Sequence, residues 1–204
     1  MLNPDTPEII LASASKSRQA LLQGAGVAAR TAPADINEKA IRTALQRSGG
    51  TTPGDIAEVL ARAKAETISE AERNAVVIGA DQVLELDGEI FEKPPDMEAA
   101  RKTILALRGK THQLHASVAV ARAGDAVWAH TETAHMTMRD FDAKFVGRYL
   151  SAAGEGVLGS VGAYQLEGVG IHLFSEIKGD YFTILGLPLL PLLDYLRGEG
   201  IVAS

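Results

Sequence analysis

The chain contains no cysteine among its 204 residues. Disulfide bonds and thiolate chemistry are therefore excluded, and the composition fits a reducing compartment. Aromatic residues make up only 5%, and no apolar stretch approaches membrane-spanning length. The N-terminus also lacks a basic segment followed by an apolar run, so no secretory signal is evident. We therefore expect a cytoplasmic protein with no membrane partner.

An excess of positive charge is missing too. The formal net charge is −6 and the sequence pI is about 5.4. This balance argues against a nucleic-acid partner, which requires a basic surface, but it allows a small anionic substrate held by a few local cations. Hydrophobic residues make up 46% and charged residues 23%, close to the globular average. The length suits a single domain spanning residues 1–204 with a sizeable core.

The stretch from Val76 to Pro94 contains the first candidate site. Its β-branched opening predicts a buried strand that ends on Asp81. Asp87-Gly88 then predicts a hairpin, whose return brings Lys93 within reach of Asp81. An acid and an amine in one place suit a polyanion and its metal ion. Scattered charges on a surface hairpin are the alternative, because clustered charges mark sites only statistically.

A second candidate site lies near the N-terminus. Glu8–Ala12 predicts a strand and Gln19–Gln23 a helix, with the hydroxyl-rich and cation-rich segment Ser13–Arg18 between them. The first N–H groups of a helix have no internal partner, so a helix start binds anions. This segment therefore predicts an anion site. Helix capping by one of its serines is the alternative.

The rest of the chain alternates helical and extended patterns. Apolar stripes predict helices at 55–72, 96–107, 141–152 and 189–197, and alternating segments predict an antiparallel pair of strands at 111–121 and 126–138. A short strand is expected at 27–31, turns at 33–38 and 179–181, and an irregular loop through the six glycines of 154–170. The predicted fold class is α/β, with a mixed, partly antiparallel sheet flanked by helices.

Several charged or titratable side chains have ordinary interpretations on spacing alone. Glu38 is more typical of a solvated loop acid than of a metal ligand. Lys64 lies on the edge of an apolar helical stripe, where a lysine usually extends to water. His112 and His115 fall on opposite faces of a predicted strand, so a shared metal ion is not expected.

Several motifs follow one another along nearly the whole chain: Leu11–Leu22, Gly79–Val83, Glu92–Pro94, Leu107–His112, Gly162–Gly168 and Gly186–Leu189. Together they resemble the Maf family of nucleoside triphosphate pyrophosphatases. The resemblance implies two lobes around a cleft and a homodimer. It also implies hydrolysis between the α and β phosphates of a nucleoside triphosphate, with Mg²⁺ or Mn²⁺, in clearing noncanonical nucleotides.

The resemblance also implies the functional residues by position. Asp81 matches the family's proton acceptor, and Glu38 and Asp81 match its metal-binding carboxylates. The implied substrate-binding residues are Ser13, Ser17, Arg18, Lys64, Gln82, Lys93 and Glu167, of which Ser17, Gln82 and Glu167 match positions tied to substrate choice.

The chain departs from the family pattern in its first motif and beside Glu38. Lys16 and Gln19 replace a usual Pro and Arg, which affects phosphate binding. Asn37 stands where an Asp is common, which would weaken metal coordination by the neighbouring Glu38.

Two features point to different branches of the family. Gln82 and Glu167 resemble the branch that acts on 7-methyl-GTP, whereas Ala163-Tyr164 is similar to the branch that acts on dTTP and UTP. A glutamate can accept hydrogen bonds from the N1–H and amino edge of a cationic methylated guanine, so we expect 7-methyl-GTP. The alternatives are dTTP and UTP, a non-catalytic nucleotide-binding regulator of cell division, and a structural domain that binds no nucleotide.

Overall fold

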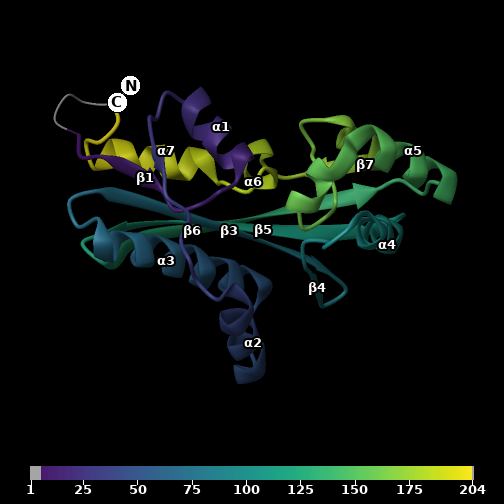
Figure 1. The fold of residues 1–204 in the computed structure, drawn as a ribbon, viewed down its shortest axis with the longest axis horizontal. Helices are drawn as coiled ribbons and strands as arrows, with labels where there is room; N and C mark the ends of the chain where they lie inside the picture. Colours follow the sequence, from purple (N-terminus) through teal and green to yellow (C-terminus); the bar gives the residue numbers. More distant parts are fainter. Residues whose placement is uncertain (1–5, 204) are drawn as a thin grey trace.

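A computed structural model describes residues 6–203 and contains one mixed sheet with helices on both faces (Figure 1). Its strands are β1 Ile9–Leu11, β2 Arg30–Thr31, β3 Val76–Leu86, β4 Glu89–Phe91, β5 Thr111–Arg122, β6 Asp125–Met138 and β7 Phe174–Lys178. Its helices are α1 Lys16–Gly24, α2 Glu38–Ser48, α3 Pro53–Ala71, α4 Met97–Leu107, α5 Ala143–Ala153, α6 Tyr181–Ile184 and α7 Leu189–Gly198, with two 3-10 helices, η1 Gly154–Gly159 and η2 Val169–Leu173. The predicted α/β fold class is confirmed.

The strand order is β2-β1-β3-β5-β6-β7, with β4 added to the outer part of β3. β1 is parallel to both of its neighbours, and all other pairs are antiparallel. The expected hairpin at Asp87-Gly88 joins β3 to β4, and the expected β5–β6 pair is present. The prediction that a strand ends on Asp81 was wrong. The alternating residues Val83–Leu86 continue β3 by pairing with β5, so Asp81 lies in mid-strand.

One edge of β3 is covered only at its two ends. β1 pairs with Val76–Ile78 and β4 with Leu84–Leu86. Along the described chain, residues 79–83 have no strand partner on that edge. Backbone groups there still require hydrogen-bond partners, which loops and side chains can supply. Asp81 lies at the centre of this gap.

Helix α3 packs very closely on one face of the sheet, beneath the gap (Figure 1). Gly79 allows this approach. A Cβ at that position would lie 2.2 Å from the carbonyl oxygen of Ala61 and 2.9 Å from the Cβ of Ala65. The absence of a side chain at Gly79 therefore brings the middle of α3, including Lys64, onto β3 next to Asp81.

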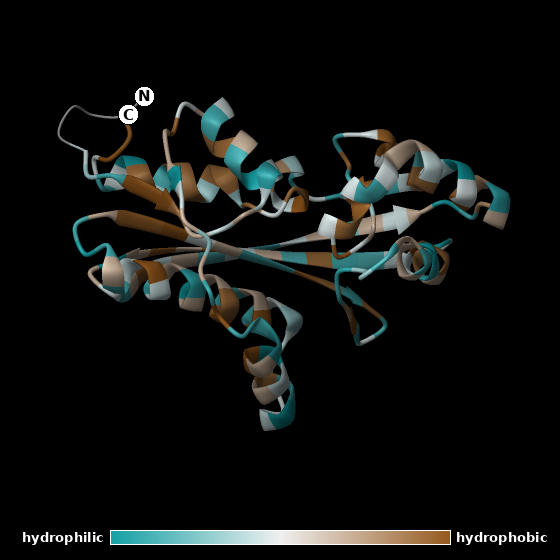
Figure 2. Ribbon diagram, viewed as in Figure 1, coloured by the Kyte–Doolittle hydropathy of each residue, from teal (hydrophilic) through white to brown (hydrophobic). Residues whose placement is uncertain are grey.

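The opposite face carries two apolar clusters, and apolar segments concentrate in the strands and on the inner sides of the helices (Figure 2). One cluster joins α1 and α7 to β1, β3 and β5. The other joins α4, α5 and the 3-10 helices to the far ends of β3, β5 and β6. Short helix α6 contacts β5 and β6. Two apolar clusters agree with two lobes, whereas the cleft between them stays a prediction.

Four segments differ from the sequence prediction. Glu38 begins α2 instead of lying in a turn, because Asn37 caps that helix and Ile41 packs in a cluster with α3 residues. The glycine-rich stretch folds into η1 and η2 and leads to β7, and the expected 27–31 strand shortens to β2. The turn expected at 179–181 leads into α6, which Asp180 caps. Within residues 6–203, no helix is long and apolar enough to cross a membrane.

His112 is a titratable group buried inside the second apolar cluster. Its side chain is fully buried, and its Nε2 lies 2.7 Å from the hydroxyl oxygen of Tyr164. Its Nδ1 has no hydrogen-bond partner in the described part of the chain. Burial in apolar surroundings lowers the pKa of His112 to about 4. His115 lies on the other face of β5, beside Thr133, which confirms the predicted separation of the two histidines.

We expect acid to destabilise the fold through His112. The unfolded chain binds this proton with a pKa of about 6.5, so the stabilisation is complete above that pH and is lost as the pH falls toward 4. The loss amounts to about 3 kcal/mol at pH 4. Urea unfolding at pH 7 and pH 4 should show a smaller loss for His112→Gln than for the wild type. Equal losses in the two proteins would contradict this role.

Candidate functional site

Lys64 and Asp81 form a buried ion pair at the gap in the edge of β3. Lys64 Nζ lies 2.6 Å from Asp81 Oδ1 and 2.8 Å from Glu38 Oε1. Lys64 is 8% exposed and Asp81 is 5% exposed. The interpretation of Lys64 as a lysine that extends to water was therefore wrong, because the close packing of α3 at Gly79 turns it toward the strand.

The second oxygen of Asp81 is left without a partner. Its Oδ2 is buried and accepts no hydrogen bond from the described residues. A buried polar atom of this kind costs about 1–3 kcal/mol and usually indicates a bound water, ion or ligand. Asp81 therefore has one oxygen fixed by Lys64 and one available for chemistry.

Glu38 closes this group from the first turn of α2. Partial burial raises the pKa of Glu38, but the hydrogen bond from Lys64 and the nearby positive charges outweigh it, so the net effect lowers the pKa. Glu38 is therefore ionised at neutral pH. The interpretation of Glu38 as a solvated loop acid was wrong, since α2 positions its carboxylate against Lys64.

Arg18 binds the edge of β3 just beyond the end of β1. The last contact from the β1 side is donated by the Ala12 N–H to the Ile78 carbonyl. The next carbonyl on this edge, that of Ala80, accepts from Arg18 Nη1 at 2.8 Å. Arg18 Nη1 also donates to Ser13 Oγ at 3.1 Å. Arg18 is thereby fixed beside Asp81.

The remaining Arg18 nitrogens differ in their contacts. Nε donates to the Gly186 carbonyl at 2.7 Å, whereas Nη2 makes no hydrogen bond to any residue of the described range. Burial lowers the pKa of Arg18, and the charges of Asp81 and Glu38 oppose this effect. Because arginine stays protonated in proteins, Arg18 offers a charged donor to an anion. Ser15 caps α1 by accepting from the Arg18 N–H, as the capping alternative expected.

Lys93 returns from the β4 hairpin toward the same group. Partial desolvation of its ammonium and the positive charge of Arg18 lower the pKa of Lys93, while Glu38 and Asp81 raise it. The residue as a whole remains exposed to solvent. The Asp81 charge acts on the pKa of Lys93, whereas the expected approach of the Lys93 ammonium to Asp81 stays a prediction.

Three further polar residues lie beyond this ionic group. Ser17 Oγ on α1 donates to Glu167 Oε1 at 3.0 Å, which joins the first helix to the loop before η2. Gln82 is adjacent to Asp81 in β3, so its side chain emerges on the opposite face of the sheet. There Gln82 Nε2 donates to the carbonyls of Thr183 and Ile184 at 3.1 and 3.0 Å.

Glu38 and Asp81 have the chemistry of a partial Mg²⁺ or Mn²⁺ site. Both are carboxylates, Asp81 Oδ2 is unsatisfied, and the Lys64 ammonium lies between them where a cation is favoured. No set of three His, Cys, Asp or Glu side chains within residues 6–203 forms a metal cluster. Two carboxylates are nevertheless sufficient for an ion that takes its other ligands from water and substrate phosphates.

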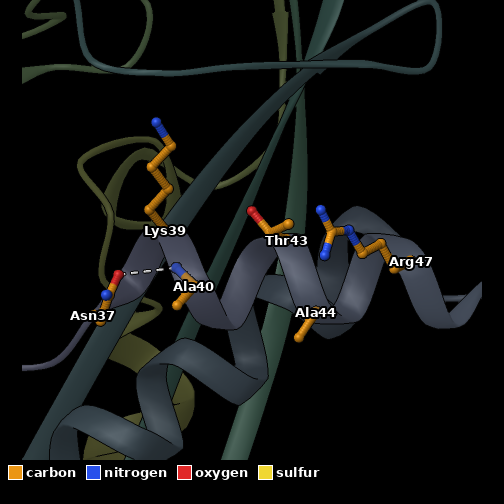
Figure 3. Close-up of a pocket in the computed structure, with 6 residues that line it drawn as sticks. All are labelled: Asn37, Lys39, Ala40, Thr43, Ala44 and Arg47. Carbon is orange, nitrogen blue, oxygen red and sulfur yellow. Dashed lines mark hydrogen bonds between the residues drawn. The ribbon is translucent and has the colours of Figure 1, made fainter.

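A groove of about 420 Å³ on the outer side of α2 lies apart from this site (Figure 3). Its lining consists of Asn37, Lys39, Ala40, Thr43, Ala44 and Arg47. Asn37 Oδ1 accepts from the Ala40 N–H at 2.9 Å. Asn37 therefore serves as a helix cap, a position where asparagine and aspartate are nearly equivalent.

The sequence profile of the Maf-like protein family matches residues 8–199. The chain belongs to the Maf family. A relative from Brucella abortus biovar 1 (strain 9-941), named 7-methyl-GTP pyrophosphatase, is 56% identical over 194 residues, which cover 95% of this chain and 97% of the relative. A relative of the same name from Mesorhizobium japonicum is 52% identical, over 97% of this chain and 98% of the relative. A nucleoside triphosphate pyrophosphatase from Granulibacter bethesdensis is 47% identical, over 93% and 96%.

The fold thus places most of the residues implied by the Maf resemblance in two connected groups. One group contains Ser13, Arg18, Glu38, Lys64, Asp81 and Lys93. The other contains Ser17 with Glu167, and Gln82 of β3 donates to carbonyls of α6. Their roles in binding and catalysis stay predictions.

Some partners of the Maf site had no side-chain signal in the sequence. The carbonyls of Ala80 and Gly186 orient Arg18, and those of Thr183 and Ile184 orient Gln82. Backbone acceptors are the same in every residue, so no residue type identifies them. The glycine at position 186 is the one residue type that bears on these acceptors, because the turn there has a φ of +89°, which favours glycine.

Proposed function

We propose that this Maf protein is a nucleoside triphosphate pyrophosphatase that produces a nucleoside monophosphate and pyrophosphate. The observation that carries the proposal is the state of Asp81. One of its oxygens is fixed by Lys64 and the other is unpartnered, and Arg18 and Lys93 place positive charge at the same gap in the sheet. A carboxylate that can accept a proton beside cations that can hold phosphates suits this hydrolysis.

The phosphate chain is bound by charges that are local in an acidic protein. Arg18 Nη2, the Lys93 ammonium and the first N–H groups of α1 face the substrate triphosphate in this proposal. Ser13 holds the Arg18 guanidinium in place through its hydroxyl. The strand β1 ends beside this group, and ligands of open sheets bind outside the carboxyl ends of parallel strands.

The chemical step is the attack of water on the α phosphorus. As the new O–P bond forms, the bond from the α phosphorus to the α-β bridging oxygen breaks, and pyrophosphate leaves with that electron pair. Asp81 accepts the water's proton at Oδ2, while Lys64 holds Oδ1 and keeps the carboxylate oriented. A Mg²⁺ or Mn²⁺ ion held by Glu38 and Asp81 would neutralise charge on the phosphate oxygens.

The preferred base in this proposal is 7-methylguanine. Glu167 is exposed, and only one of its oxygens accepts from Ser17. Its other oxygen accepts no hydrogen bond from the described residues and can accept from a guanine edge, and a carboxylate suits a cationic ring. Tyr164, which resembles the dTTP and UTP branch, is 4% exposed and bonds to His112. The similarity to the dTTP and UTP branch therefore concerns a core residue and not a base contact. Gln82 and Glu167 remain as the residues that bear on the base, and they favour 7-methyl-GTP over dTTP and UTP.

We place this activity in nucleotide-pool housecleaning in the cytoplasm, carried out by a homodimer. The absence of cysteine fits a reducing compartment, and the names of the relatives support an activity on nucleoside triphosphates. Light scattering at micromolar concentration tests the dimer, which a monomeric mass would exclude.

A nucleotide panel tests the function directly. We expect release of pyrophosphate and monophosphate with Mg²⁺ or Mn²⁺, fastest with 7-methyl-GTP among 7-methyl-GTP, GTP, dTTP, UTP and CTP. A faster reaction with dTTP and UTP would mean that Gln82 and Glu167 do not set the base as argued. Binding of nucleotide without pyrophosphate from any of the five would support the non-catalytic regulator instead.

A further inference from the structure

Helix α6 and the residues after it form a turn, Asp180–Gly186, that contacts both substrate-facing groups. The last carbonyls of any helix have no partner inside the helix. Here those of Thr183 and Ile184 accept from Gln82 Nε2, and the Thr183 carbonyl also accepts from the Gly186 N–H. Beyond the helix, the Gly186 carbonyl accepts from Arg18 Nε. One short turn therefore orients a candidate base contact and a candidate phosphate contact.

The contacts of Gln82 fix which end of its amide faces a ligand. Two carbonyl oxygens can only be satisfied by the NH₂ group, so the amide orientation is determined by chemistry. Both hydrogens of Nε2 are used in this way. Gln82 Oε1 makes no hydrogen bond with the residues of the described chain and is left as an acceptor. The direction in which the Gln82 Oε1 points therefore depends on the position of α6.

The position of α6 depends in turn on Thr183 and Glu132. Thr183 is fully buried, and its Oγ1 donates to Glu132 Oε2 on β6. Gln82 pairs with Ala116, and Ala116 with Glu132, so the three side chains share one row across the sheet. Adjacent strands lie about 4.8 Å apart, and alanine between two long side chains leaves space for Thr183. Glu132 thus anchors α6 from one side and Gln82 from the other.

We propose that Thr183 and Glu132 are positioning residues that set base preference by holding α6 against Gln82. Neither side chain needs to touch the nucleotide. Removal of the Thr183 hydroxyl frees α6 from β6 and lets the Gln82 amide rotate. Either the oxygen or the NH₂ group of Gln82 can then face the base. The loss should therefore fall mainly on the preferred nucleotide and on KM, whereas a purely structural loss would affect every nucleotide equally.

The test compares Thr183→Val with Thr183→Ser and the wild type. Because the role rests on the proposed function, equilibrium binding of 7-methyl-GTP and dTTP is measured by calorimetry with metal chelated, alongside turnover with Mg²⁺. We expect Thr183→Val to reduce the affinity ratio between the two nucleotides about tenfold, with the same change in the kcat/KM ratio, and Thr183→Ser to keep the wild-type ratio.

Ser69→Ala is a matched control for the loss of a buried hydroxyl. Ser69 is also fully buried, and its Oγ accepts from the Gly124 N–H, where α3 meets the β5–β6 turn. This variant should lose stability without a change in either ratio. An unchanged ratio in Thr183→Val, or an equal loss for both nucleotides, would overturn the role of Thr183. Absence of turnover in the wild type would instead refute the proposed function, and the binding ratio would still decide the positioning role.

Discussion

Asp81→Asn should lower turnover of the preferred nucleotide by about 10²-fold or more. The amide has nearly the same shape as the carboxylate and keeps an oxygen for Lys64, but it cannot accept the proton of the attacking water. Since this proton transfer occurs in the transition state, kcat should fall much more than nucleotide affinity. Initial rates of pyrophosphate release across a range of substrate concentrations separate the two quantities.

Glu176→Gln is the matched control for Asp81→Asn. Glu176 also pairs with a lysine, at 3.0 Å from Lys178, but both side chains are exposed on β7. An exposed pair contributes about 0–1 kcal/mol, so this variant should keep the wild-type rate. Near-normal turnover of Asp81→Asn would remove Asp81 from the role of base and leave Glu38 as the remaining carboxylate of the group.

The sequence carried enough information for the fold class and for most of the side chains that meet around Asp81. The β-branched run before Asp81, the Asp87-Gly88 hairpin and the helical stripes are local patterns, and each formed as predicted. Even so, the end of β3 was misjudged, because a polar residue within a strand resembles a strand end when only its own segment is considered. Pairing with β5 carries the strand past Asp81.

Other features depend on contacts between distant segments and had no local signal. Lys64 is buried because Gly79, 15 residues away in the sequence, lets α3 approach the sheet. Glu132 is an ordinary strand glutamate until α6 places Thr183 against it. Arg18 is aimed by carbonyls of β3 and of the Gly186 turn. Residue types predict which groups can do chemistry, whereas tertiary packing decides which ones meet.

Lys64→Met should destabilise the protein by about 3 kcal/mol in the absence of divalent metal. Methionine keeps most of the apolar stem but removes the ammonium that lies between Asp81 and Glu38. Asp81 then stays buried without a hydrogen-bonded counter-charge, which is costly even with the charges of Arg18 and Lys93 nearby. Urea unfolding in buffer with a chelator measures this loss against the wild type.

The same variant tests whether the two carboxylates hold a metal ion. Without Lys64, Mg²⁺ or Mn²⁺ should bind the pair with less competition and raise the thermal midpoint of Lys64→Met more than that of the wild type. In the double variant Lys64→Met/Asp81→Asn, the buried negative charge is absent. Much of the lost stability should then return without metal, and the metal effect should shrink. If Lys64→Met is as stable as the wild type, then Lys64 contributes nothing to holding Asp81, and a metal shift that is unchanged in the double variant would exclude Asp81 as a metal ligand.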